Sequence, residues 1–311
     1  TMARVPWDVP TNFIASGGHG HGEEDVTRWT DYLTANIKPN FLLKFHGVSF
    51  HHYSYPRNTP GPLVIDDKGP ATNFPEEEWF STLQASLKMD EYLSANCEIL
   101  ERNDPDKQVG FYVDEWGTWY DQEEGTTPGF LYQQNSLRDA VVAALSFNVF
   151  HSYADRVQMT NIAQMVNVLQ AMILTEGEQM LLTPTYHVFR MYTPFQGATT
   201  VPVELSATGE YRSGDEAIPA VSATAARAVD GKMYLGLVNV DPKHEQNISI
   251  VLKGMAAYSA RGEILTADSM DAHNTFDLPH ALAPQPYNAT GSDGALTLKV
   301  PAKSVMVLHV E

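Results

Sequence analysis

Residues 109–120 read Val109-Gly110-Phe111-Tyr112-Val113, then Asp114-Glu115-Trp116, then Gly117-Thr118-Trp119-Tyr120. The first five residues form a short apolar run of the kind that makes a buried strand, and acidic and aromatic residues follow directly. In folds built from parallel strands, the carboxyl ends of the strands carry the functional site. The stretch therefore predicts a buried parallel strand with a carboxylate and aromatic rings at its functional end.

The same pattern recurs on either side of this stretch. Three further runs predict strands: residues 13–18, which end in two glycines, residues 47–50, which precede His51-His52-Tyr53, and residues 145–150, which precede His151. Apolar residues at helical spacing predict helices over residues 25–37, 76–100, 135–144 and 162–174. Strands that alternate with helices at this spacing predict about four parallel βαβ units.

The second half of the chain has a different periodicity. Apolar and polar residues alternate with a period of two over residues 232–240, 248–252, 295–300 and 304–310, which is typical of an antiparallel β-sandwich. We therefore expect an α/β domain over residues 1–184 and an all-β, jelly-roll-like sandwich over residues 185–311.

Composition excludes several classes of protein. The chain has 311 residues, of which 43% are hydrophobic, so it can bury a sizeable core, yet it contains no apolar stretch long enough for a membrane helix. Its net charge is −18, from 20 basic and 38 acidic residues, so we expect no nucleic acid or membrane partner. Its one cysteine, Cys97, excludes an intrachain disulfide and fits a reducing, cytoplasmic compartment.

Glu115 is the first candidate for chemistry. Aromatic side chains beside a carboxylate suit a carbohydrate, because a sugar presents flat apolar faces as well as hydroxyl groups. The alternative is a surface acid whose neighbours Trp116 and Trp119 pack under a loop. Gln164 is a second candidate, either as a ligand for sugar hydroxyls or as a surface amide.

Histidines raise the question of a metal site. His51 and His52 are adjacent, so on a strand they face opposite ways and at most one points into a pocket. His19 and His21 could supply a further ligand, but Gly-His runs are usually loops, and Glu23 and Glu24 fit a helix amino terminus better. We expect neither a metal nor a cofactor.

Four sequence blocks together resemble a known family. The blocks are residues 112–116, 135–140, 163–167 and 182–189, which read YVDEW, NSLRDA, AQMVN and LTPTYHVF. In order, spacing and composition they resemble the carboxyl-terminal part of the α-L-arabinofuranosidases of glycoside hydrolase family 51. The resemblance covers essentially the whole chain and implies a (β/α)8 TIM barrel followed by a β-sandwich, with strands five to eight of the barrel present here.

The resemblance also implies roles for individual residues. Glu115, at the end of the seventh barrel strand, would be the nucleophile of a retaining enzyme that releases terminal α-L-arabinofuranosyl residues from arabinan, arabinoxylan or oligosaccharides. His51 and Tyr53 match the family's His-x-Tyr at the end of strand six, and Tyr53 would hydrogen-bond the nucleophile. Trp119 would line the sugar pocket and Gln164 would bind sugar hydroxyls.

One departure from the family pattern is important. The family's acid/base is the glutamate of a Gly-Asn-Glu motif, and no Gly-Asn-Glu occurs in this sequence. The resemblance therefore implies half a barrel, whose open sheet edges call for a complementing amino-terminal half or a homo-oligomer, while Glu23 and Glu24 are weak candidates for a substitute acid. The alternatives are a related barrel glycosidase acting on xylosides or β-glycosides, and a non-catalytic sugar-binding or structural fragment.

Overall fold

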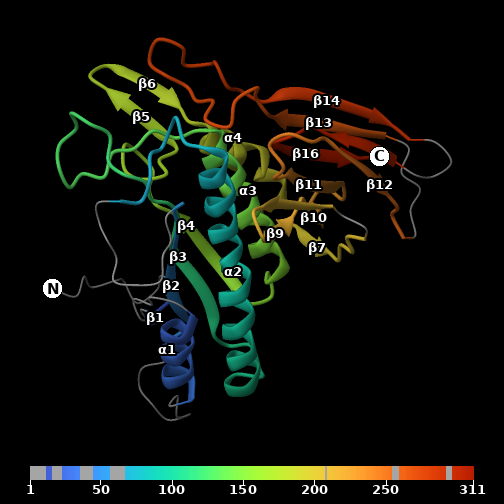
Figure 1. Ribbon diagram of the computed structural model, residues 1–311. Helices are drawn as coiled ribbons and strands as arrows, with labels where there is room; N and C mark the ends of the chain where they lie inside the picture. The colour runs from blue at the N-terminus through green and yellow to red at the C-terminus, as the bar shows by residue number, and fades with distance from the viewer. Residues whose placement is uncertain are drawn as a thin grey trace. The chain divides into compact units, whose positions relative to one another are not determined.

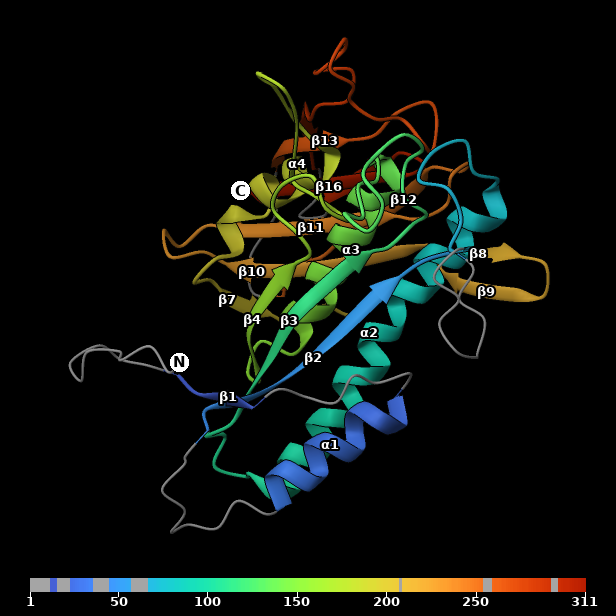
Figure 2. The ribbon, with the colours of Figure 1, turned by 90° about the vertical axis from the view of Figure 1, so that its left-hand side faces the viewer.

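A four-stranded sheet occupies the first half of the chain. In the computed structural model its strands are β1 (Ile14–Ala15), β2 (Gly47–Ser54), β3 (Gly110–Thr118) and β4 (Val157–Ile162), hydrogen-bonded in the order β1-β2-β3-β4. The helices α1 (Glu23–Ala35), α2 (Glu76–Asn103) and α3 (Leu137–Ser152) alternate with these strands along the chain. β1 pairs with β2 in parallel, and the arrows of β2, β3 and β4 run the same way (Figure 2).

The structure describes residues 12–15, 23–35, 45–56, 67–206, 209–253, 259–291 and 296–311, and of residues 23 and 24 the backbone alone. They divide into two units. The first unit takes its residues from 1–52, 88–116 and 153–161, and the second from 53–87, 117–152 and 162–311. The boundary between them crosses β2 and β3 just before their carboxyl ends, and the predicted domain boundary after residue 184 stays a prediction.

Apolar side chains of β2 and β3 form the core of the first unit. Phe50 and Phe111 are almost fully buried and meet edge to face, with ring centroids 6.1 Å apart. Gly47 opens β2 because a side chain there would collide with the ring of Tyr112, whose nearest carbon lies 2.2 Å from the position of a Cβ. A buried ion pair lies just before β3 and β4, where Arg156 is 2.8 Å from Asp104.

The sandwich of the second unit consists of two antiparallel sheets. Its larger sheet has the order β14-β13-β16-β11-β10-β7, and β12 pairs with β15 in the smaller one. The strands are β7 (Thr199–Val201), β10 (Val221–Arg227), β11 (Met233–Asn239), β12 (Gln246–Ile250), β13 (Ser259–Leu265), β14 (Gln285–Thr290), β15 (Leu296–Val300) and β16 (Ser304–Val310). Buried side chains of β15 pack with those of β11 and β16 in one apolar core, which confirms the predicted sandwich (Figure 1).

Two helices and two hairpins complete the second unit. α3 is buried along most of its length and contacts α4 (Pro184–Met191) as well as β10, β11 and β16. The hairpins are β5 (Ile173–Glu176) with β6 (Gln179–Leu182), and β8 (Glu210–Ser213) with β9 (Glu216–Pro219), and a short 3₁₀ turn (Thr193–Phe195) follows α4.

Two sequence-based predictions are wrong. Residues 145–150 are not a strand, because α3 continues to Ser152, and a helix buried on nearly all sides shows the same unbroken apolar run as a buried strand. Residues 162–174 are not a helix either. β4 ends at Ile162, and the following loop holds Asn167 at φ 60° and Leu169 at φ 52°, a conformation that no right-handed helix contains.

Candidate active site

His51 lies between two carboxylates in the first unit. Its Nε2 is 3.3 Å from Oδ1 of Asp114, and its Nδ1 is 3.4 Å from Oε2 of Glu115. His52, which faces the other way on β2, is buried against the edge of Tyr92. The strand therefore presents one histidine to the acidic pair and uses the other in the core, which agrees with the predicted alternation.

Glu115 is the more accessible of the two carboxylates. Its side chain is 45% exposed, against 36% for Asp114 and 31% for His51. A carboxylate that is held beside an imidazole, yet open to solvent, has the accessibility that a nucleophile or a sugar ligand needs. The structure thus brings together two of the predicted site residues, His51 and Glu115, and adds Asp114 to them.

Tyr53 and Trp119 form an aromatic pair in the second unit. Their ring centroids are 5.2 Å apart with an interplanar angle of 68°, and both residues are partly buried. The ammonium group of Lys68, a residue that is only 2% exposed, lies 4.7 Å from the centroid of Trp119. A cation over an indole face stabilises the ring, so this arrangement fixes Trp119 on one side.

The backbone around Trp119 is held at three successive amides. The N–H of Thr118 donates to Oε1 of Gln170 at 2.8 Å, and the N–H of Tyr120 donates to Oε1 of Gln133 at 2.8 Å. Between them, the N–H of Trp119 donates to the carbonyl of Ser54 at 3.1 Å. Both glutamines are almost fully buried, so solvent does not compete for these bonds. The backbone that carries the indole of Trp119 is therefore held in one position.

Asp139 connects this segment to α3. Its carboxylate accepts hydrogen bonds from the hydroxyl of Thr118 and from the N–H of Ser136, the latter at 2.7 Å, and its carbonyl accepts from Nε2 of Gln170 at 2.7 Å. Burial raises the pKa of the Asp139 carboxyl, while the charge of Arg138 and the bonds from Ser136 and Thr118 oppose that rise. The sequence analysis assigned no role to this aspartate, although a charged Arg-Asp pair inside an apolar helix is itself a sign of a buried network.

Gln164 lies in the second unit, in the loop after β4. The residue is exposed, and its N–H donates to the carbonyl of Val168 at 3.1 Å. Its side chain is open to solvent, as a sugar ligand requires. The predicted proximity of Glu115 to Tyr53, Trp119 and Gln164 stays a prediction.

Neither a metal-binding cluster nor a membrane-spanning helix is found among the described residues. Among the described residues, no group of three or more histidine, cysteine, aspartate or glutamate side chains has the geometry of a metal site. The candidates His19 and His21, and the side chains of Glu23 and Glu24, lie outside those residues. In the part of the chain that the structure describes, no helix is both long and apolar enough to cross a membrane.

Comparison with known proteins identifies the family. The α-L-arabinofuranosidase C-terminal domain matches residues 114–304. A crystal structure of the GH51 arabinofuranosidase from Xanthomonas axonopodis pv. citri is 40% identical and superposes with a TM-score of 0.91, covering 99% of this chain and 60% of that one. This chain belongs to the α-L-arabinofuranosidases of glycoside hydrolase family 51. The resemblance drawn from the four sequence blocks is confirmed.

Relatives of this chain include two proteins named as intracellular enzymes. An intracellular exo-α-L-arabinofuranosidase of Bacteroides ovatus is 41% identical over 96% of this chain and 55% of that protein. An intracellular exo-α-(1→5)-L-arabinofuranosidase of Streptomyces lividans is 23% identical over 93% of this chain and 43% of that protein. The chain thus spans about half the length of the curated relatives it matches.

Proposed function

We propose that this chain is the part of an α-L-arabinofuranosidase that carries the nucleophile, with Glu115 in that role. The observation that supports this most directly is the accessible carboxylate of Glu115, 3.4 Å from the ring of His51, in a chain that belongs to this family. The strands β1 to β4 would then be strands five to eight of the family's (β/α)8 barrel, and their alternation with α1 to α3 supports that assignment.

The proposed reaction retains the configuration of the sugar. The Glu115 carboxylate attacks the anomeric carbon, the leaving-group oxygen departs with the electrons of the glycosidic bond, and water then hydrolyses the glycosyl-enzyme ester. His51 would hold the attacking oxygen in position. Tyr53 would hydrogen-bond the nucleophile, while Trp119 lines the sugar pocket and Gln164 binds its hydroxyl groups.

The reaction also needs a general acid that gives a proton to the leaving group. Since the family's Gly-Asn-Glu does not occur among these 311 residues, we propose that the general acid comes from outside them. Without an acid, a nitrophenolate can still depart, whereas a sugar alkoxide needs a proton. The chain alone should therefore cleave aryl arabinofuranosides slowly and leave arabinan and arabinoxylan nearly untouched, a loss of roughly 10²–10⁴-fold or more.

A comparison of two matched variants tests this proposal. Glu115→Gln should abolish aryl arabinofuranosidase activity without lowering the melting temperature, whereas Glu98→Gln, on an exposed position of α2, should change neither. A mass increment on the Glu115 peptide, trapped with a slowly hydrolysed aryl arabinofuranoside, would identify the nucleophile. Full activity of Glu115→Gln would contradict the assignment, and rapid release of arabinose from polymer by the chain alone would contradict the external acid.

A partner for the sheet belongs to the same proposal. Both outer strands carry exposed apolar side chains, with Phe13 and Ile14 at β1 exposed by 61% and 38%, and Met159 on β4 by 43%. An exposed edge strand can pair with a strand of another chain. We therefore propose that a complementing amino-terminal half or a second copy of this chain covers these edges, in the cytoplasm. Light scattering that finds a monomer of this chain alone would contradict this part of the proposal.

A further inference from the structure

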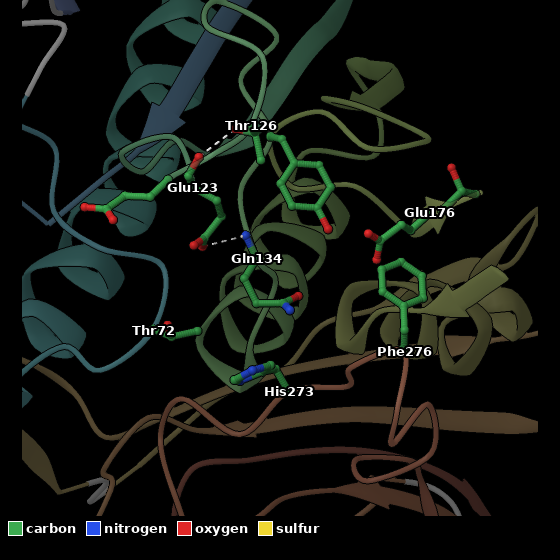
Figure 3. A pocket seen from close by; sticks show the side chains of 10 residues that line it. Thr72, Glu123, Thr126, Gln134, Glu176, His273 and Phe276 are labelled. Carbon is green, nitrogen blue, oxygen red and sulfur yellow. Dashed lines mark hydrogen bonds between the residues drawn. The ribbon is translucent and has the colours of Figure 1, made fainter. Parts of the chain in front are cut away.

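A polar pocket lies in the second unit. It has a volume of about 470 Å³, within the range of roughly 300–1,000 Å³ that small-molecule sites occupy. Figure 3 shows Glu123 on one side of it, Glu176 and Phe276 on the other, and Thr72 with His273 along a third side. None of these residues has a role in the reaction proposed above.

Most of the chain segments that line this pocket follow the strands of the four-stranded sheet. Thr72 lies in the segment after β2, Glu123 and Gln134 lie after β3, and Glu176 lies on the hairpin after β4. In parallel α/β folds these are the segments that form substrate sites, because they follow the carboxyl ends of the strands. The sandwich adds Phe276 and His273 from the connection between β13 and β14.

Hydrogen bonds between these segments preform the pocket. Oε1 of Glu123 accepts from the N–H of Gln134 at 3.2 Å, and on the opposite side Asn167 donates to the hydroxyl of Thr175 at 2.7 Å. Buried Asn274 joins the sandwich to the hairpin by donating to the carbonyl of Leu182 at 2.9 Å. The pocket walls therefore need little ordering when a ligand binds, which favours affinity.

The lining chemistry excludes an anion and suits a sugar. It includes the carboxylates of Glu123, Glu124 and Glu176 but no lysine or arginine, so a phosphate or carboxylate ligand would be repelled. Carboxylates accept strong hydrogen bonds from hydroxyl groups, and the rings of Tyr132 and Phe276 offer flat surfaces for the C–H faces of a sugar. Burial together with the charges of Glu123 and Glu176 raises the pKa of Tyr132, so its hydroxyl stays protonated and able to donate.

We propose that this pocket is a saccharide-binding site for arabinosyl units of an oligosaccharide. The proposal rests on the proposed function, since it takes the ligand to be part of the same substrate. It predicts that affinity for the substrate rises with chain length because of Glu176, Tyr132 and Phe276. Single arabinosyl groups, such as those of aryl substrates, would gain nothing from the pocket.

A local probe separates this pocket from the candidate active site. The chain is labelled with 3-fluorotyrosine, and the ¹⁹F signal that disappears in Tyr132→Phe is assigned to Tyr132. An α-1,5-linked arabinotriose should shift that signal with saturation. Glu176→Gln should weaken this binding by about fivefold, the effect of about 1 kcal/mol when a charge-assisted hydrogen bond becomes a neutral one. Glu178→Gln, an exposed position on the same hairpin outside the pocket, should leave it unchanged.

Each result decides the proposal. The proposal is overturned if arabinotriose does not shift the Tyr132 signal, or if the Glu176→Gln chain binds it as tightly as the unaltered chain. A shift caused by spermidine but not by the sugar would also overturn it, because the pocket would then be a cation site. Hydrolysis of an aryl arabinofuranoside by the unaltered chain is measured in parallel. Failure of this hydrolysis alone would count against the proposed function, while a saturable Tyr132 shift that Glu176→Gln weakens would still support saccharide binding in the pocket.

Discussion

Replacing Gln170 by leucine should release the segment that carries Trp119. Gln170 is fully buried, and it accepts from the N–H of Thr118 at 2.8 Å and donates to the carbonyl of Asp139 at 2.7 Å. Leucine fills a similar volume but makes neither bond, so the N–H of Thr118 loses its partner inside the protein, while the carbonyl of Asp139 loses one donor and keeps its helical one. At about 1–3 kcal/mol for the unsatisfied N–H and about 1 kcal/mol for the other bond, the free energy of unfolding should fall by roughly 2–4 kcal/mol.

Thermal unfolding and sugar binding together measure this effect. For a chain of this size the melting temperature should drop by about 4 °C or more. A displaced Trp119 should also weaken sugar binding, so KM for an aryl arabinofuranoside should rise more than kcat falls. Gln108→Leu is the matched control, because Gln108 is exposed and its side chain donates to the nearby carbonyl of Asp106, and it should change neither quantity.

Two results would refute this reasoning about Gln170. An unchanged melting temperature would show that the two bonds are replaced by others in the variant. A lower melting temperature with unchanged KM would show that Gln170 supports the fold without positioning Trp119. Gln170→Glu adds a further check, because it keeps an oxygen for the N–H of Thr118 but loses the donor to the carbonyl of Asp139. Its melting temperature should therefore lie below that of the native chain.

Three other groups give predictions that do not depend on the proposed reaction. Arg156→Met leaves Asp104 buried without its partner and should cost about 3–5 kcal/mol of unfolding free energy, whereas Lys107→Met removes an exposed pair and should cost less than about 1 kcal/mol; equal effects in urea unfolding would contradict this. Burial lowers the pKa of His151 to about 4. Between about pH 6.5 and pH 4 the imidazole is therefore protonated in the unfolded chain but neutral in the folded chain. Stability should therefore fall by about 2–3 kcal/mol between pH 7 and pH 4, and His151→Phe should show a smaller fall; an equal fall in both proteins would place the effect elsewhere. Burial raises the pKa of Cys97 to about 11, so Ellman's reagent at pH 8 should modify it roughly a hundredfold more slowly than a free thiol, and rapid labelling of the folded chain would be inconsistent with this burial.

The sequence predicts those features that depend on local periodicity. The clean alternation of β15, with Leu296, Leu298 and Val300 buried, and the opposite orientation of His51 and His52 both follow from the period of a strand. The order of strands and helices through residue 103 follows from the same kind of pattern. The apolar run at 109–113 predicts the strand that carries Glu115, although β3 continues three residues past Glu115 to Thr118.

The features that sequence reasoning missed depend on contacts between distant residues. Apolar residues 162, 165, 166 and 169 mimic a helical stripe, but the chain there turns, because Asn167 at positive φ bonds to Thr175 and Gln170 is drawn inward to Thr118. The pocket at Glu176 combines segments about 200 residues apart in sequence, from Thr72 to Phe276. Neither a hydrophobic period nor a short motif encodes such a combination.

The amino-terminal turn of α3 links these observations. Arg138 donates to the carbonyl of Pro70, after β2, at 2.7 Å, and its guanidinium lies 3.5 Å from the ring centroid of Phe74. Its neighbour Asp139 bonds Thr118 at the end of β3 and, through its carbonyl, Gln170 after β4. Two adjacent buried residues thus fix the segments that follow three successive strands.

A charged pair in that position has a physical advantage over an apolar one. Apolar side chains at 138 and 139 would make no directional contacts, whereas Nη2 of Arg138 donates to the carbonyl of Pro70 and the carboxylate of Asp139 accepts from Thr118 and Ser136. Losing such a bond inside the protein costs free energy. The pair therefore selects one arrangement of the three segments. Since Trp119 directly follows Thr118, and the segment that leads to Glu123 continues from there, the ring of Trp119 and the pocket wall take their positions from the same turn of α3.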